Sequence, residues 1–330
     1  MNNRRKLIVA LGAGALAAPF GCLAQQQGKV WRIGYLDFGS RQSVVNSGWR
    51  GALIEGLREL GYVEGNNLVL QERYAEGNSD RLNGFAAELV EQKVDLIIIY
   101  GATAARFGKR VTATIPIVIT AIADPVGNGF AASLARPGGN ITGMTGGAED
   151  TNQKMVELLS VANPKLKRIA VLTNPLNDSH ASLLLSVQAA ARKTGKQALP
   201  KNVRTLDEIE RGFATMTREH TDGVIIFVDA FLFSQRMQIA ALAIKHRIPS
   251  IYGSGGYAEV GGLMSYGPDI NDNFRRTAVF VDKILKGTKS GDIPFEQPTR
   301  YYFVINRKTA NALGMKLTNE LLVRADKVIE

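Results

Sequence analysis

Cysteine is almost absent from this sequence, because Cys22 is the single example among 330 residues. It lies in a leader-like segment, so a chain cleaved after Ala24 contains no thiol at all. This scarcity excludes a disulfide framework, a cysteine nucleophile and a cysteine-based zinc site together. The stability of the mature chain must therefore come from an ordinary hydrophobic core.

Histidine is scarce too, and the common catalytic motifs are missing. His180, His220 and His246 are the only histidines, and no Ser or Cys motif accompanies them. There is no Gly-x-x-x-x-Gly-Lys-Ser/Thr loop and no nucleophile elbow, and the Gly-rich stretch at 253–256 lacks the dinucleotide fingerprint. We predict no catalytic residue, no cofactor and no metal site. An enzyme that uses His180 as an acid–base group is the rival hypothesis.

Basic residues are in excess, but no long basic run is present. The formal net charge is +10, and removing Arg4, Arg5 and Lys6 leaves +7 without any run of five or more basic residues. Nucleic-acid binding usually needs a clustered basic stripe. The composition therefore indicates a basic soluble surface and no nucleic-acid partner.

The first residues are typical of an export signal. Basic residues at 4–6 precede an apolar stretch at 7–20 that is too short to span a bilayer. The small residues Cys22 and Ala24 stand three and one positions before Gln25, which predicts a signal peptide at 1–24 that is cleaved after Ala24. We expect a periplasmic protein of about 306 residues, long enough for two domains.

Two alternatives remain open for the leader. The Arg4-Arg5 pair before an apolar stretch indicates the twin-arginine route, whereas a plain secretory signal can also begin with basic residues. Lipidation of Cys22 would leave an anchored lipoprotein. Pro19-Phe20-Gly21 lacks the expected Leu and small-residue pattern, which favours cleavage after Ala24.

Strands alternate with helices in the first half of the chain. The periodicity predicts strands at 30–36, 68–73, 94–99 and 115–119, and helices at 47–60, 81–92 and 102–113. The segment at 94–99 is almost continuously apolar, as expected for a parallel strand covered on both faces. Together these segments predict a doubly wound parallel sheet.

The same order recurs in the second half. Strands are expected at 166–172, 224–228 and 247–251, with a helix at 178–193 after the first of them. Gly212-Phe213-Ala214 parallels Gly84-Phe85-Ala86, and Asp222 precedes its apolar strand as Asp95 precedes another. We therefore predict an α/β protein of two doubly wound, Rossmann-like lobes in tandem. Ligands bind at the carboxyl ends of such strands, so two facing lobes would enclose one cleft.

Five segments together carry a resemblance to a known family. They are LRELGYVEGN at 57–66, DPVG at 124–127, ASLARPGGN at 132–140, GGLMSYG at 261–267 and VDKILKG at 281–287. From about Trp31 onward the chain resembles the transporter substrate-binding proteins that include tryptophan- and tyrosine-binding lipoproteins. This family has the type I periplasmic-binding-protein fold.

The resemblance implies a hinge of three crossings between the lobes. They are expected near Thr142, near 266–268 and near 287–292. Lobe 1 would then comprise residues 29–142 and 267–288, and lobe 2 residues 143–266 and 289–330. Closure about this hinge would trap a small molecule between the lobes.

Loops after the strands supply the candidate ligand-binding residues. In the first lobe, glycines let a ligand approach the backbone closely, and the free N–H groups at helix starts suit a carboxylate. Ordinary helix capping explains a Ser or Thr at these positions equally well. In the second lobe, the resemblance implies that the loop containing Asn174, Asn177 and Ser179 binds the ligand's charged end. It also implies that Asp229 faces an ammonium group. The alternative for Asp229 is a role as a helix N-cap. Tyr252 and Tyr266 would line the floor of the cleft and the hinge between the lobes. The candidates are Gly39, Ser40, Gly101, Ala102, Thr103, Asp124, Asn174, Asn177, Ser179, Asp229, Tyr252 and Tyr266.

Aromatic residues are candidate walls, and two positions depart from the family pattern. The wall candidates are Phe38, Trp49, Phe231 and Phe233, although aromatic residues at helical spacing are more often core. Asp37 stands where the family more often has a small polar residue, and Ala230-Phe231 replaces the polar pair after the acid. The expected ligand is accordingly a small carboxylate-bearing molecule, an amino acid or an aromatic acid.

The resemblance implies a function and its partners. We expect a monomeric extracytoplasmic binding protein that delivers its ligand to the membrane subunits of an ABC-type importer. A periplasmic sensory protein that works with a membrane receptor is the alternative, since the fold serves both uses.

Overall fold

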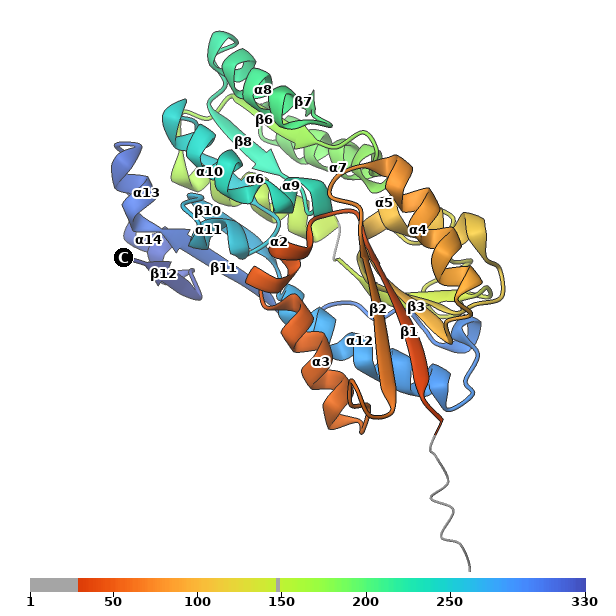
Figure 1. Ribbon diagram of the computed structural model, residues 1–330. Helices are drawn as coiled ribbons and strands as arrows, with labels where there is room; N and C mark the ends of the chain where they lie inside the picture. Colours follow the sequence, from red (N-terminus) through yellow and green to blue (C-terminus); the bar gives the residue numbers. More distant parts are fainter. Residues whose placement is uncertain (1–28, 147–148) are drawn as a thin grey trace, which may run out of the picture.

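The computed structural model describes residues 29–146 and 149–330. The predicted signal peptide, with Cys22 and the cleavage site after Ala24, lies outside the described residues. Two α/β lobes are present, each built on its own sheet (Figure 1). The prediction of two doubly wound α/β lobes is confirmed.

The first sheet contains five parallel strands in the order β2-β1-β3-β4-β5. The central strands β3 and β4 are buried along their whole length, since helices cover both faces of the sheet. At the edge, β2 is largely half-buried. The strands are β1 (Trp31–Asp37), β2 (Leu68–Tyr74), β3 (Leu96–Tyr100), β4 (Ile117–Ile122) and β5 (Ile141–Thr145).

Two helices from distant parts of the chain, α3 (Trp49–Glu59) and α12 (Ile270–Leu285), lie side by side on one face of this sheet (Figure 1). Gly56 permits this close approach, because a Cβ there would lie 2.5 Å from the carbonyl oxygen of Arg275. α4 (Ser79–Glu91) and α5 (Gly101–Val111) contact each other and the same sheet. Thus α12 packs with the first lobe although it lies between β10 and β11 of the second sheet in the sequence.

The second sheet has seven strands in the order β12-β11-β10-β9-β8-β6-β7, and only the β10–β11 pair is antiparallel. Its strands are β6 (Arg168–Thr173), β7 (Gln197–Asn202), β8 (Gly223–Ile226), β9 (Ser250–Tyr252), β10 (Met264–Pro268), β11 (Tyr301–Asn306) and β12 (Lys327–Ile329). Its helices are α6 (Glu149–Ala162), α7 (Ser179–Lys193), α8 (Leu206–Arg218), α9 (Ala230–Ser234), α10 (Arg236–Lys245), α11 (Gly256–Glu259), α13 (Arg307–Ala312) and α14 (Asn319–Val323).

One helix was not predicted. The helix expected at 47–60 is present as α3, but α2 (Arg41–Asn46) precedes it and a turn separates the two. Gly48 adopts a left-handed conformation with φ 79°, which ends one helix and starts the next. The loop at 38–40 joins α2 to the carboxyl end of β1.

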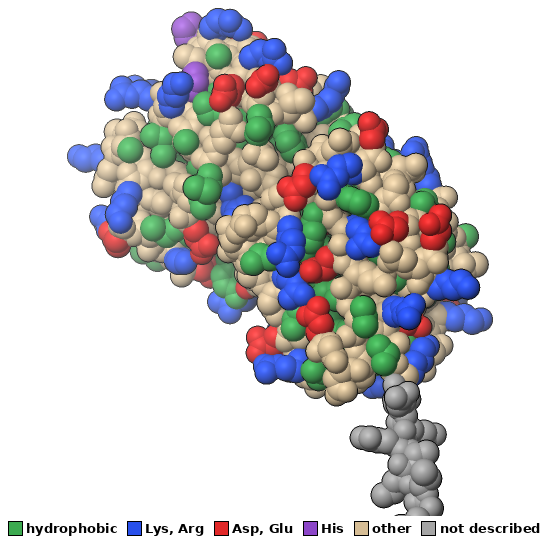
Figure 2. Space-filling view, in the orientation of Figure 1, with side chains coloured by type: hydrophobic (Ala, Val, Ile, Leu, Met, Phe, Trp, Pro, Cys, Tyr) green, Lys and Arg blue, Asp and Glu red, His purple; other side chains and the backbone are tan. Residues whose placement is uncertain are grey.

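The surface shows mixed charge. On the face in Figure 2, Lys and Arg side chains are interspersed with Asp and Glu. Across residues 29–146 and 149–330, no helix combines the length and the apolar character that crossing a bilayer requires.

Candidate ligand-binding cleft

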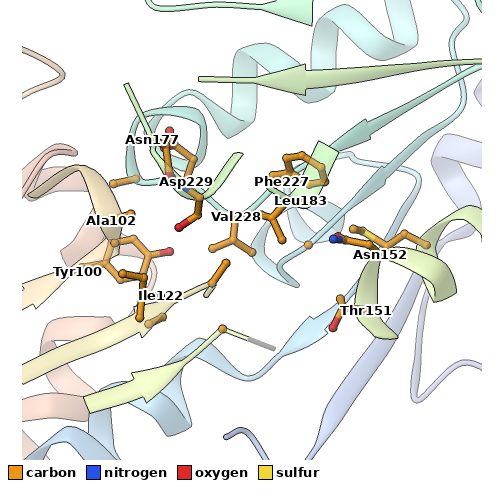
Figure 3. A pocket seen from close by; sticks show the side chains of 18 residues that line it. Tyr100, Ala102, Ile122, Thr151, Asn152, Asn177, Leu183, Phe227, Val228 and Asp229 are labelled. Atoms are coloured by element: carbon orange, nitrogen blue, oxygen red, sulfur yellow. Dashed lines mark hydrogen bonds between the residues drawn. The ribbon is translucent and has the colours of Figure 1, made fainter. Parts of the chain in front are cut away.

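A cavity of about 50 Å³ lies between the lobes, at the carboxyl ends of both sheets (Figure 3). The first lobe contributes the ends of β3, β4 and β5, and the second lobe contributes the ends of β8 and β9 with the first turns of α6 and α7. This volume has room for a few water molecules. The described lining is Tyr100, Gly101, Ala102, Ala121, Ile122, Ala123, Gly146, Thr151, Asn152, Met155, Asn177, Ser179, Leu183, Phe227, Val228, Asp229, Ala230 and Gly253.

Polar contacts join the lobes around this cavity. Arg106 pairs with Asp178 at 2.9 Å, and the hydroxyl of Thr103 donates to the Leu176 carbonyl at 3.2 Å. The amide of Asn128 donates to the Ser179 hydroxyl at 3.0 Å. These contacts exist only when the lobes face each other closely, so they belong to the closed form of the cleft.

Aromatic side chains form a second contact between the lobes. Trp49 stacks on Phe233 of the other lobe with 4.3 Å between ring centroids, and on Phe274 of α12 with 5.3 Å. Phe38 contacts Phe231 with centroids 6.5 Å apart. The four predicted wall residues therefore lie in this buried interface and not among the residues that line the cavity.

Asp229 is the charged group of the cavity, and only 3% of its surface is exposed. It follows β8 and caps α9 by accepting from the Leu232 N–H at 2.9 Å. The amides of Asn174 and Asn177 also donate to its carboxylate, at 3.3 Å and 2.9 Å. The N-cap role that the sequence offered as an alternative is therefore present, and the same carboxylate also borders the cavity.

His180 supports this loop. Its Nδ1 accepts from the Asn174 backbone N–H at 2.9 Å, and its Nε2 faces the Val228 carbonyl at 3.4 Å. The first contact requires a lone pair on Nδ1, which places the proton of the neutral ring on Nε2. Burial lowers the pKa of His180, which favours the neutral ring. The ring thus holds the 174–178 loop in position instead of facing the cavity as an acid–base group.

Hydrogen-bond donors lie at the first-lobe end of the cavity. Tyr100 ends β3 and its buried hydroxyl has no partner within the described chain. Gly101, with φ 81°, begins α5, and Gly101 and Ala102 line the cavity, so the free N–H groups of this helix end lie beside it. A hydroxyl and helix N–H groups together suit a carboxylate.

Asp37, just outside the cavity lining, is almost fully buried at 1% exposure. It accepts from the Tyr35 hydroxyl at 2.7 Å and from the Gly39 N–H at 2.6 Å, which fixes the turn after β1. Burial raises the pKa of Asp37 to about 6. The two hydrogen bonds oppose this rise, whereas the nearby carboxylates of Asp229 and Glu76 add to it.

This raised pKa predicts a pH dependence of stability. A carboxyl with a raised pKa holds its proton more tightly in the folded than in the unfolded chain, so its contribution to the free energy of unfolding falls as pH rises from 3.8 to about 6. Asp37→Asn should remove that fall, and its stability relative to wild type should increase from pH 4 to pH 7. Urea unfolding at both pH values measures this. Parallel pH profiles for the two proteins would refute the prediction.

The structure brings five of the predicted residues to the cavity, namely Gly101, Ala102, Asn177, Ser179 and Asp229. Asn174 and Thr103 lie behind this lining, where they bond Asp229 and the Leu176 carbonyl. The rest have other places in the fold. Gly39 follows Asp37, Ser40 caps α2, Asp124 accepts from the Gly127 N–H, Tyr252 stacks on Tyr257, and Tyr266 stacks on Tyr301.

Sequence reasoning missed part of the lining. Thr151, Asn152 and Met155 come from the first turns of α6, which directly follows the first crossing between the lobes. No turn signal or motif marks this helix start as part of a site. Tyr100 and Phe227 end apolar strands, and their position at strand ends is the signal that could have identified them.

Comparisons with known proteins agree with this architecture. A family model described as ABC transporter substrate binding protein matches residues 45–329. A tyrosine-binding protein of Clostridioides difficile is 27% identical over 263 residues, which is 80% of this chain and 75% of that protein.

Two solved structures are also similar. One is an ABC domain in complex with L-Trp from Streptococcus pneumonia, with 27% identity, a TM-score of 0.84, and coverage of 91% of this chain and 99% of that one. The other is a conserved domain protein from Vibrio cholerae, with 26% identity, a TM-score of 0.85, and coverage of 91% and 100%. The type I periplasmic-binding-protein fold expected from the resemblance is confirmed.

Proposed function

Because this chain belongs to the family of ABC transporter substrate-binding proteins, we propose that it captures an amino acid outside the cytoplasm and delivers it to an ABC importer. The observation that carries the choice of ligand is the buried carboxylate of Asp229 at the cavity. Its hydrogen-bond donors in the described chain are neutral amides. A buried anion needs a compensating cation, and the α-ammonium group of an amino acid would supply it.

The carboxylate of the same ligand would bind at the first lobe. The Tyr100 hydroxyl and the N–H groups at the start of α5 come from the first lobe and border the same end of the cavity as Asn177 and Asp229, which lie on two loops of the second lobe. An amino acid has its two charges on one carbon, so it would bridge these groups of opposite character. The ligands of these two relatives, tyrosine and L-Trp, belong to the same class.

Binding would shift the protein toward its closed form. The ammonium would contact the second lobe and the carboxylate the first, so the ligand gains both sets of contacts only when the lobes close. We propose the hinge and lobe boundaries expected from the sequence, with crossings near Thr142, near 266–268 and near 287–292. The importer's membrane subunits would then recognise the closed monomer.

Export is part of this proposal. A signal peptide at 1–24 would direct the chain to the periplasm, where the importer receives its ligand. A sensory role with a membrane receptor would use the same cleft and the same closure. The two functions differ in what happens to the ligand after binding.

An uptake experiment tests the importer role. Cells that lack the gene should take up less of the bound amino acid, added as a radiolabelled compound at low concentration, and a plasmid copy of the gene should restore uptake. An unrelated sugar serves as the control. Unchanged uptake, with the purified protein binding normally, would favour the sensory role.

A further inference from the structure

Asn152 is a buried amide that the described protein leaves without a hydrogen-bond partner. Its side chain lies on the first turn of α6, is 3% exposed and lines the cavity. Its Nδ2 atom has no partner in the part of the chain that the structure describes. Buried donors are rarely left unpaired, because losing their water contacts costs free energy. The position of this amide on a ligand cavity indicates that the ligand completes it.

The amide lies away from the groups proposed to hold the ligand's charges. In Figure 3, Tyr100 and Ala102 lie at one end of the cavity, with Asp229 near them, and Thr151 and Asn152 lie at the other end. The nitrogen of Asn152 points toward the centre of the cavity (Figure 3). A ligand whose charged carbon is held at Asp229 would therefore direct its side chain toward Asn152.

Apolar side chains line the path between the two ends. They are Ile122, Met155, Leu183, Phe227 and Val228. Most of this wall offers no hydrogen bond, so the middle of the ligand's side chain must be apolar. The polar side chains of the second-lobe lining are Asn177, Ser179 and Asp229, together with Thr151 and Asn152 at the far end.

Building on the proposed function, we propose that Asn152 determines ligand specificity by donating a hydrogen bond to an acceptor at the far end of the ligand's side chain. The ligand is then an amino acid with an apolar middle and a polar tip, such as the phenolic hydroxyl of tyrosine. Phenylalanine has the same shape without the acceptor and would leave the amide unpaired. The indole N–H of tryptophan only donates, so it does not satisfy Nδ2 either.

Titration calorimetry on protein stripped of bound ligand tests this inference with matched ligands. Tyrosine is compared with phenylalanine, and glutamine with methionine, so that each pair differs mainly in the polar tip. We expect the polar member of the binding pair to bind about 100-fold more tightly, since sites built around a hydrogen bond strongly reject analogues that lack it. Equal affinities within that pair, or tighter binding of tryptophan than of tyrosine, would overturn the inference.

Asn152→Leu separates specificity from a merely structural role. Leucine has a similar volume but no hydrogen-bonding group, so affinity for the polar ligand should fall at least tenfold while affinity for the apolar analogue stays equal or rises. Asn311→Leu, on the exposed face of α13, is the matched control and should change neither affinity. If Asn152→Leu does not fold, Asn152→Ala makes the same test. An equal loss for both ligands would overturn the inference, whereas failure of wild type to bind any amino acid would overturn the proposed function itself.

Discussion

Asp229→Asn should weaken amino-acid binding by about 1.5–3 kcal/mol, or roughly 10- to 150-fold in the dissociation constant. The substitution removes the negative charge that the ligand's ammonium needs. It keeps a side-chain oxygen that can accept from the Leu232 N–H, and Asn is as good an N-cap as Asp. The NH2 group of the new side chain then faces the Asn177 amide, which loses its acceptor, so the thermal midpoint should fall as well. Calorimetry on the folded variant measures the loss of affinity.

Two comparisons make this result specific. Asp207→Ala removes an exposed carboxylate from the first turn of α8 and should leave the affinity unchanged. A carboxylic acid without an amino group should bind poorly to wild type and lose little in the Asp229→Asn protein. Wild-type affinity of the Asp229→Asn protein for its amino acid would rule out an ammonium contact at this position.

Gly143→Ala should destabilise the protein by about 3 kcal/mol or more, because it combines backbone strain with a steric clash. Gly143 lies within β5 at φ 144°, a conformation that side chains rarely permit. A Cβ there would lie 2.0 Å from the carbonyl oxygen of Ile119 and 2.6 Å from its nitrogen. Both atoms belong to β4, so relief requires moving one strand away from its neighbour. Urea unfolding measures the effect, and a loss of soluble protein would indicate an even larger one.

Gly84→Ala is the matched control for this substitution. Gly84 lies inside α4, and a Cβ there meets no atom within 4 Å. Alanine should stabilise the helix by roughly 1 kcal/mol, since glycine is the poorer helix former. If both alanine variants shifted stability by the same small amount, the strand contact of Gly143 would not be as tight as the structure has it.

The fold was predictable because its signals are local. Apolar runs such as 94–99 and 224–228 can be buried only between layers of helices, and β3 and β8 overlap them. The helix α2 was missed because its six residues are too few to show a helical period. The short helices α9 and α11 carry too few residues to show periodicity.

Part of the site was predictable, from strand ends and from the resemblance that suggested Asn177 and Ser179. Gly101 and Asp229 directly follow apolar strands, and both line the cavity. Asn152 could not be found in this way, because its place depends on how α6 starts after the chain enters the second lobe. The aromatic residues predicted as walls do not line the cavity, because they pack against residues that are distant in the sequence. Trp49 and Phe233 stack across the lobe interface although they lie 184 positions apart in the sequence, and no local pattern predicts such a contact.

The most direct test of amino-acid binding is a thermal-stability screen of residues 25–330, stripped by unfolding and refolding, against amino acids and aromatic acids. A ligand at 100 times its dissociation constant stabilises by about 2.7 kcal/mol. Each kcal/mol of added stability raises the midpoint of thermal unfolding by about 2–4 °C, so this midpoint should rise by several degrees. The account predicts this rise with one chemical class of amino acid and none with the corresponding acids that lack the amino group. A well-folded protein whose midpoint no amino acid raises would contradict it.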